Sequence, residues 1–114
     1  MNALGKQAEQ EACRYLKKQG YQILAQNWRH HFGEIDIIAQ DAQELVFVEV
    51  KSLTNSQTFD PMDHITHKKI NTLRKLAQSY TSNLVKDIDQ RIDIILVYCD
   101  TLPWRIDHFK DAIE

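Results

Sequence analysis

Apolar side chains recur every three or four residues in two parts of the chain, which predicts two amphipathic helices. The first helix is expected over residues 2–19, and Gly20 is expected to end it. The second is expected to begin after an N-cap at Thr66 and to continue to Tyr80. The apolar positions that define the first helix are Leu4, Ala8, Ala12, Tyr15 and Leu16.

Shorter stretches rich in β-branched and aromatic residues predict strands between and after these helices. The first three strands are joined by short connections and are expected to form an antiparallel meander. The second helix then makes a crossover to a parallel fourth strand. The order α-β-β-β-α-β-β predicts a mixed central sheet flanked by helices, an α/β fold. The expected strands are Tyr21–Trp28, Ile35–Ala39, Leu45–Lys51, Ile92–Tyr98 and, at an edge of the sheet, Trp104–Phe109.

Composition narrows the class of protein. A chain of 114 residues suits a single domain spanning 1–114. The net charge of −2 is not that of a protein that coats DNA regardless of sequence, so affinity for nucleic acid has to come from a local patch. Cys13 and Cys99 lie far apart, which argues against a zinc site and favours the cytoplasm. No apolar run is long enough to span a membrane, so no membrane partner is expected.

Two apolar strands carry charge where a core would be expected, at Asp36 and at Glu49 and Lys51. Side chains alternate along a strand, so Glu49 and Lys51 share one face. A hairpin loop with an even residue count centred on Ala42-Gln43 places Asp36 opposite Glu49, with their Cβ atoms roughly 5 Å apart. Because Ala42-Gln43 suits a two-residue turn poorly, a four-residue loop over 41–44 is expected.

Facing carboxylates of this kind repel, which raises one pKa unless a cation neutralises the pair. Mg²⁺ or Mn²⁺ is the natural ion for such oxygen ligands. Lys51 would then orient a water molecule or stabilise negative charge on a phosphate. The set suits metal-assisted phosphodiester hydrolysis. The spacing alone fits equally well with an ion pair between Glu49 and Lys51 and a solvated Asp36 at the strand end.

The order of Asp36 and then Glu49-Val50-Lys51 matches the D…(D/E)xK pattern of restriction-endonuclease-like nucleases. The whole chain resembles the YraN family of small bacterial endonuclease-like proteins. This resemblance implies a restriction-endonuclease-like core, similar to archaeal Holliday-junction resolvases. The stretches that carry it are GKQAE at 5–9, ACRYL at 12–16, KQGY at 18–21, NW at 27–28, GEIDIIA at 33–39, LVFVEVK at 45–51 and HFKDAI at 108–113.

The resemblance also implies roles for individual residues. Asp36 and Glu49 would be metal ligands, together with the backbone carbonyl of Val50. Lys51 would be the catalytic lysine. Such folds often add an acidic residue from the first helix, and Glu9 fits that position.

Glu9 lies at the margin of the apolar arc of the first helix, from which it can face the sheet. Glu11 lies at the opposite margin beside Arg14 and is better explained as a solvated helix charge. We therefore favour Glu9 over Glu11 as the additional catalytic and metal-binding carboxylate.

Candidate nucleic-acid-binding residues lie on either side of these motifs. Lys68 and Lys69 begin the second helix, where free N–H groups also favour anions. Arg29 and His30 follow Trp28 beside the second strand. The alternative interpretation is a solvated helix face and an ordinary loop.

The sequence thus favours a Mg²⁺- or Mn²⁺-dependent endonuclease that acts on DNA, with selectivity for a DNA structure and a homodimer if both strands of a junction are cut. The alternative is a non-catalytic nucleic-acid-binding or scaffold protein that retains the fold. The absence of Lys and Arg from residues 52–60 favours this alternative. Asp93 interrupts the fourth strand and is expected to pair with Arg91 or His108 without a catalytic role.

Overall fold

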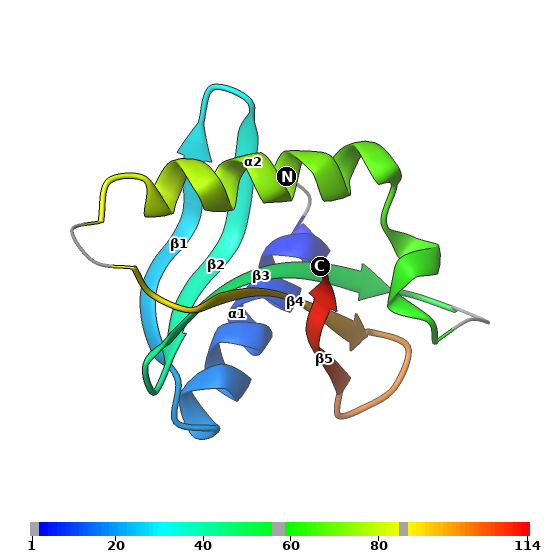
Figure 1. Cartoon of the computed structure of the whole chain (residues 1–114). Coiled ribbons are helices and arrows are strands. Elements are labelled where there is room, and N and C mark those ends of the chain that lie inside the picture. Colours follow the sequence, from blue (N-terminus) through cyan, green and yellow to red (C-terminus); the bar gives the residue numbers. More distant parts are fainter. Residues whose placement is uncertain (1–2, 56–58, 85–86) are drawn as a thin grey trace.

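The computed structural model describes residues 3–55, 59–84 and 87–114. Within these residues it contains two α-helices, one short 3-10 helix and a five-stranded sheet (Figure 1). The elements are α1 (Ala3–Lys18), β1 (Gln22–His30), β2 (Gly33–Asp41), β3 (Glu44–Leu53), η1 (Pro61–His64), α2 (His67–Thr81), β4 (Gln90–Tyr98) and β5 (Arg105–Ile113).

The strands lie in the order β1-β2-β3-β4-β5. Neighbouring strands are antiparallel except β3 and β4, which are parallel and are connected through α2. The predicted α/β fold, with its meander, parallel crossover and edge strand, is confirmed. No helix in the described part of the chain is long and apolar enough to cross a membrane.

The two helices cover opposite faces of the sheet, and each face has its own hydrophobic core. Strand β3 shows how the sequence divides between them. Phe47 belongs to the core beneath α2, whereas Val46 and Val48 belong to the core beneath α1. Glu49 and Lys51 alternate in step with Phe47 and therefore lie on the face that α2 covers.

The turn between β2 and β3 differs from the prediction. The register is the expected one, with Ile37 opposite Val48, but Asp41 and Glu44 also pair. The turn is therefore the two-residue Ala42-Gln43 rather than a four-residue loop, and Ala42 adopts a left-handed φ of 55°. A buried guanidinium explains the difference, because Arg91 binds Asp41 at 3.3 Å and Glu44 at 2.6 Å and so holds the last pair of the hairpin together.

The start of α2 is fixed by a cap and by close packing. The Thr66 hydroxyl oxygen accepts the Lys69 N–H at 3.1 Å, which confirms the predicted N-cap. Further along the helix, Thr72 lies so close to Gly33 that a Cβ added there would come within 2.9 Å of the Thr72 methyl carbon. The contact at Gly33 helps to set where α2 passes over the sheet.

Candidate functional site

Asp36 and Glu49 are brought together where the β2–β3 ladder ends. The last backbone pair on this side is Ile37 with Val48. One residue further, the Asp36 carboxylate accepts the Val50 N–H at 2.8 Å and lies close enough to Glu49 for the charges of the two groups to interact. Asp36 is only 9% exposed, so it is not the solvated strand-end residue of the alternative interpretation.

The environment of this acidic pair disfavours two negative charges. Burial raises the pKa of Asp36, although the Val50 N–H lowers it in part. Burial, and then the charge of Asp36, raise the pKa of Glu49 to about 8, against an opposing effect of Lys69. One oxygen of Glu49, Oε1, is buried without a hydrogen-bond partner. A carboxylate oxygen in that position is suited to a cation.

Two lysines lie near Glu49. Lys69 reaches over from α2, with its Nζ atom 3.6 Å from Glu49 Oε2. Lys51 is exposed on the same face of β3, two residues after Glu49. The sequence placed Lys69 among phosphate-binding residues and did not reveal its contact with Glu49.

Glu9 is held by Asn27, a residue that the sequence did not mark as part of the site. Asn27 donates to Glu9 Oε1 at 2.8 Å and to Glu34 Oε1 at 3.2 Å. Asn27 adopts a left-handed φ of 50° in β1, a conformation that asparagine tolerates better than most residues. Burial raises the pKa of Glu9, and the charge of Asp36 adds to this rise.

The arrangement of carboxylates limits which groups hold a metal. Across residues 3–55, 59–84 and 87–114, no group of three His, Cys, Asp or Glu side chains is placed to bind one ion. Asp36 and Glu49 are thus a pair of carboxylates, without Glu9 placed as a third ligand. The role of Glu9 as a metal ligand stays a prediction. Glu11 instead forms an ion pair with Arg14, as the sequence indicated.

The remaining candidates for nucleic-acid binding are two exposed cations, Lys68 and Arg29, and the half-buried His30. Lys68 is exposed beside Lys69. Arg29 is also exposed and contacts Glu34 at 3.1 Å. His30 stacks on Trp28 with ring centroids 6.0 Å apart. Arg29 and His30 are the last two residues of β1, and Asp36 lies beyond the β1–β2 turn, in the first half of β2.

A second cluster of charged residues surrounds Asp93 and is structural. Asp93 is fully buried and binds both Arg91, at 3.0 Å, and His108, at 2.7 Å. It also accepts the Asp111 N–H at 2.9 Å. His108 in turn contacts the Tyr15 hydroxyl at 3.0 Å. Every carboxylate oxygen of Asp93 is thus occupied, which leaves no place for a ligand.

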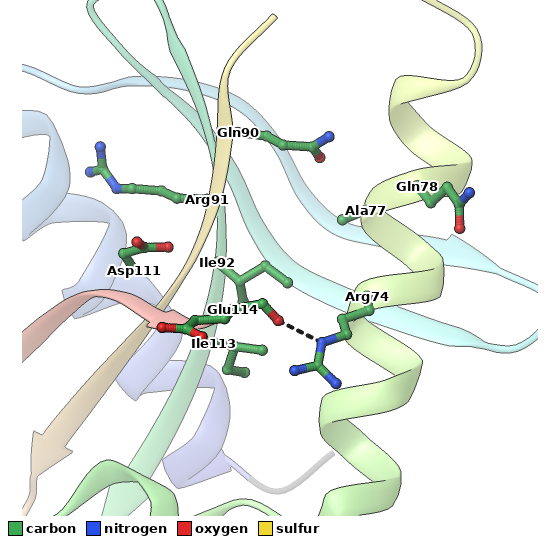
Figure 2. A pocket seen from close by; sticks show the side chains of 9 residues that line it. All are labelled: Arg74, Ala77, Gln78, Gln90, Arg91, Ile92, Asp111, Ile113 and Glu114. Carbon is green, nitrogen blue, oxygen red and sulfur yellow. Dashed lines mark hydrogen bonds between the residues drawn. The ribbon is translucent and has the colours of Figure 1, made fainter.

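An open pocket lies between α2 and the start of β4 and has a volume of about 260 Å³ (Figure 2). Arg74 points into it and donates to the backbone oxygen of Glu114 at 2.7 Å. Gln90, on the opposite wall, pairs with Leu45 beside the β2–β3 turn. The pocket therefore lies on the side of Glu49 towards the β2–β3 turn, and neither Asp36 nor Glu49 lines it.

Comparison with known proteins identifies relatives along most of the chain. A model of the uncharacterised protein family UPF0102 matches residues 8–97, a range that includes Asp36, Glu49 and Lys51. A UPF0102 protein of Thermotoga maritima is 44% identical over 105 residues, which cover 92% of each chain. A UPF0102 protein of Flavobacterium psychrophilum is 40% identical over 111 residues, which cover 97% of this chain and 93% of the relative.

Proposed function

This chain belongs to the uncharacterised protein family UPF0102, the YraN family, and we propose that it is a metal-dependent nuclease that hydrolyses phosphodiester bonds of DNA. The observation that carries the proposal is the buried pair of Asp36 and Glu49, in which Glu49 Oε1 has no hydrogen-bond partner. Burial of two facing carboxylates lowers the stability of a fold. Such pairs are therefore found mainly where a function requires them.

The residues of the site would have separate roles in metal binding and in catalysis. The Val50 N–H fixes the Asp36 carboxylate, and the strand register fixes Glu49 beside it. These carboxylates, with the Val50 carbonyl, would hold Mg²⁺ or Mn²⁺. A divalent ion held there would activate a water molecule and offset charge on the phosphate. Lys51, exposed on the same strand face, would stabilise the additional negative charge of the transition state.

Glu9 would support the site from α1. Its carboxylate is held by Asn27 and lies near enough to Asp36 for their charges to interact. It therefore adds negative potential on the α1 side, where it would attract an ion or hold one of the ion's water molecules.

Lys68, Lys69, Arg29 and His30 would guide DNA to the pair. Cations near the site would bind phosphates, and the ring of His30 would stack on an exposed base. This set is small, in keeping with the net charge of −2. Selectivity for a branched or single-stranded structure would then come from shape rather than from overall charge, and cutting both strands of a junction would require two copies of the chain.

The test is cleavage of labelled single-stranded, duplex, flap and four-way-junction DNA by the purified protein with Mg²⁺ or Mn²⁺. Asp36→Asn and Lys51→Ala should each reduce the rate by at least about a hundredfold. Lys18→Ala, at the far end of α1, is the matched control and should cleave like the wild type. Cleavage that survives both site substitutions would overturn the proposal.

The second candidate function is binding of nucleic acid without catalysis. It is favoured by residues 52–60, which follow the Glu49-Val50-Lys51 segment and contain neither Lys nor Arg. Salt-dependent DNA binding by the wild type, without metal-dependent cleavage of any of the four substrates, would select this function over the nuclease.

A further inference from the structure

We infer that Lys69 is the resident cation of the acidic pair in the metal-free protein, and that a divalent ion entering the pair replaces it at Glu49. This inference deepens the proposed function and rests on a metal site at Asp36 and Glu49. It assigns to Lys69 a positioning role that is distinct from the transition-state role of Lys51.

The first observation is how the oxygens of Glu49 are occupied. Oε2 faces the Lys69 ammonium at 3.6 Å, which is an ion-pair contact but longer than a hydrogen bond. Oε1 is buried and has no hydrogen-bond partner. Lys69 therefore compensates part of the charge of Glu49 without saturating the carboxylate.

The second observation is that the backbone of Lys69 is fixed whereas its ammonium has a route out. The Lys69 N–H is held by the Thr66 cap, and the helix packs on the sheet through Leu73 and Leu76. The Lys69 side chain is nevertheless 35% exposed, while that of Glu49 is 13% exposed. The ammonium can thus swing into solvent on its flexible stem while α2 stays in place.

The third observation concerns charge. Two ionised carboxylates carry two negative charges, and Lys69 supplies one positive charge. A divalent ion at the pair neutralises both carboxylates by itself, so the ammonium beside it would gain little attraction and would be repelled by the ion. In the metal-free protein Lys69 leaves one of the two negative charges uncompensated. With a divalent ion at the pair, replacement of Lys69 leaves the site neutral, whereas keeping Lys69 beside the ion would give it a net positive charge.

The experiment compares thermal unfolding in EDTA and in saturating Mn²⁺ for four proteins: wild type, Lys69→Met, Lys69→Arg and Lys75→Met. Lys75 is exposed on the same helix and controls for the loss of a lysine from α2. In EDTA, Lys69→Met should unfold on the order of 3 °C lower than the wild type, because the acidic pair has lost its cation.

In Mn²⁺, this difference should disappear, because the ion takes the place of Lys69 in both proteins. The Mn²⁺-induced rise of the unfolding midpoint should therefore be larger in Lys69→Met than in the wild type. Lys69→Arg and Lys75→Met should both respond like the wild type. Electron paramagnetic resonance of free Mn²⁺ should show several-fold tighter binding to Lys69→Met, a change that a purely structural role would not produce.

Each other outcome has a separate meaning. An equal or smaller Mn²⁺-induced rise in Lys69→Met would overturn the replacement of Lys69 and leave the nuclease proposal standing. No Mn²⁺ response in any of the four proteins would overturn the metal site, and with it both the inference and the proposed function.

Discussion

Glu49 shows how a single residue can connect stability with a candidate activity. Burial and the charge of Asp36 raise its pKa from an ordinary 4.5 to about 8. The folded protein therefore keeps a proton that the unfolded chain releases at lower pH. When the folded state holds more protons than the unfolded state, stability falls as pH rises.

The first prediction is that the metal-free protein becomes less stable as pH rises from about 4.5 to about 8. Glu49 should account for on the order of 3 kcal/mol of this loss in unfolding free energy. Glu49→Gln has no proton to release, so its stability should fall less over the same range. Urea unfolding with EDTA at several pH values measures both slopes, and parallel slopes for the two proteins would rule out this role of Glu49.

The second prediction concerns metal affinity over the same pH range. An ion that binds the Glu49 carboxylate has to displace its proton, so affinity should rise up to tenfold per pH unit until about pH 8 and then level off. Mn²⁺ titration of the wild type should show this rise, and Glu49→Gln should bind weakly at every pH. Affinity that does not change with pH would mean that the ion binds elsewhere.

Among the elements, the β2–β3 hairpin shows what a sequence can and cannot reveal. Alternation along the strands and an even-length turn were enough to predict the register that brings Asp36 to Glu49. The two-residue turn was missed because Ala42 adopts a left-handed conformation that alanine disfavours by about 1 kcal/mol. Arg91 on β4 offsets this conformational cost by binding Asp41 and Glu44 at the two ends of the turn. A local sequence pattern does not predict a contact between residues so far apart in the chain.

Helix α2 is only partly predictable from the sequence. Its boundaries and its Thr66 cap followed from periodicity and residue type. Its contact between Lys69 and Glu49 depends on where the helix crosses the sheet, which is set by tertiary packing. One determinant of that crossing is the absence of a side chain at Gly33, beneath Thr72 and Leu76.

The third prediction tests this crossing. Gly33→Ala should lower the unfolding free energy by about 2 kcal/mol, because its Cβ would lie 2.9 Å from the Thr72 methyl carbon and the φ of 155° disfavours a side chain. Adding Thr72→Ser removes that methyl group and keeps the hydroxyl that donates to the Lys68 carbonyl.

The double variant should therefore recover part of the loss, measured by chemical denaturation, with Thr72→Ser alone as the control. If the effects of the two substitutions on the unfolding free energy are simply additive, contact with α2 is not what restricts position 33 to glycine.

At the scale of the whole molecule, the sequence order of elements was sufficient to predict the sheet and its flanking helices, but not how its parts are tied together. From β4, Arg91 contacts Tyr21 in the connection between α1 and β1 and also binds Glu44 at the β2–β3 turn. Asp93 binds His108 on β5, which in turn contacts Tyr15 on α1. The sequence indicated partners for Asp93 but not that it binds both of them. A fully buried charge requires such compensation from several elements at once.

The fourth prediction is that Asp93→Asn lowers the unfolding free energy by about 3 kcal/mol, because Arg91 and His108 lose a buried ionic partner. Burial raises the pKa of Asp93, but its hydrogen bonds to His108, the Asp111 N–H and Arg91 outweigh burial and lower it. The stabilising effect of Asp93 is therefore present above an ordinary value of 3.8 and is lost as pH falls through the lowered pKa. Asp107→Asn, which affects a more exposed pair with Arg105 on β5, is the control and should change stability by less than about 1 kcal/mol. Equal losses in the two variants, measured by urea unfolding near neutral pH, would show that the Asp93 network adds nothing beyond a surface pair.

The hydrogen bond from Val50 to Asp36 also makes the candidate site visible to nuclear magnetic resonance without any probe attached to it. The amide proton of Val50 points at the carboxylate, so its chemical shift depends on the charge and coordination of that group. Protonation of Asp36, or an ion bound to it, would displace this one signal in an amide spectrum before the rest of the strand changes. A titration followed at Val50 would thus report the occupancy of the pair directly, even if no substrate for the protein were known.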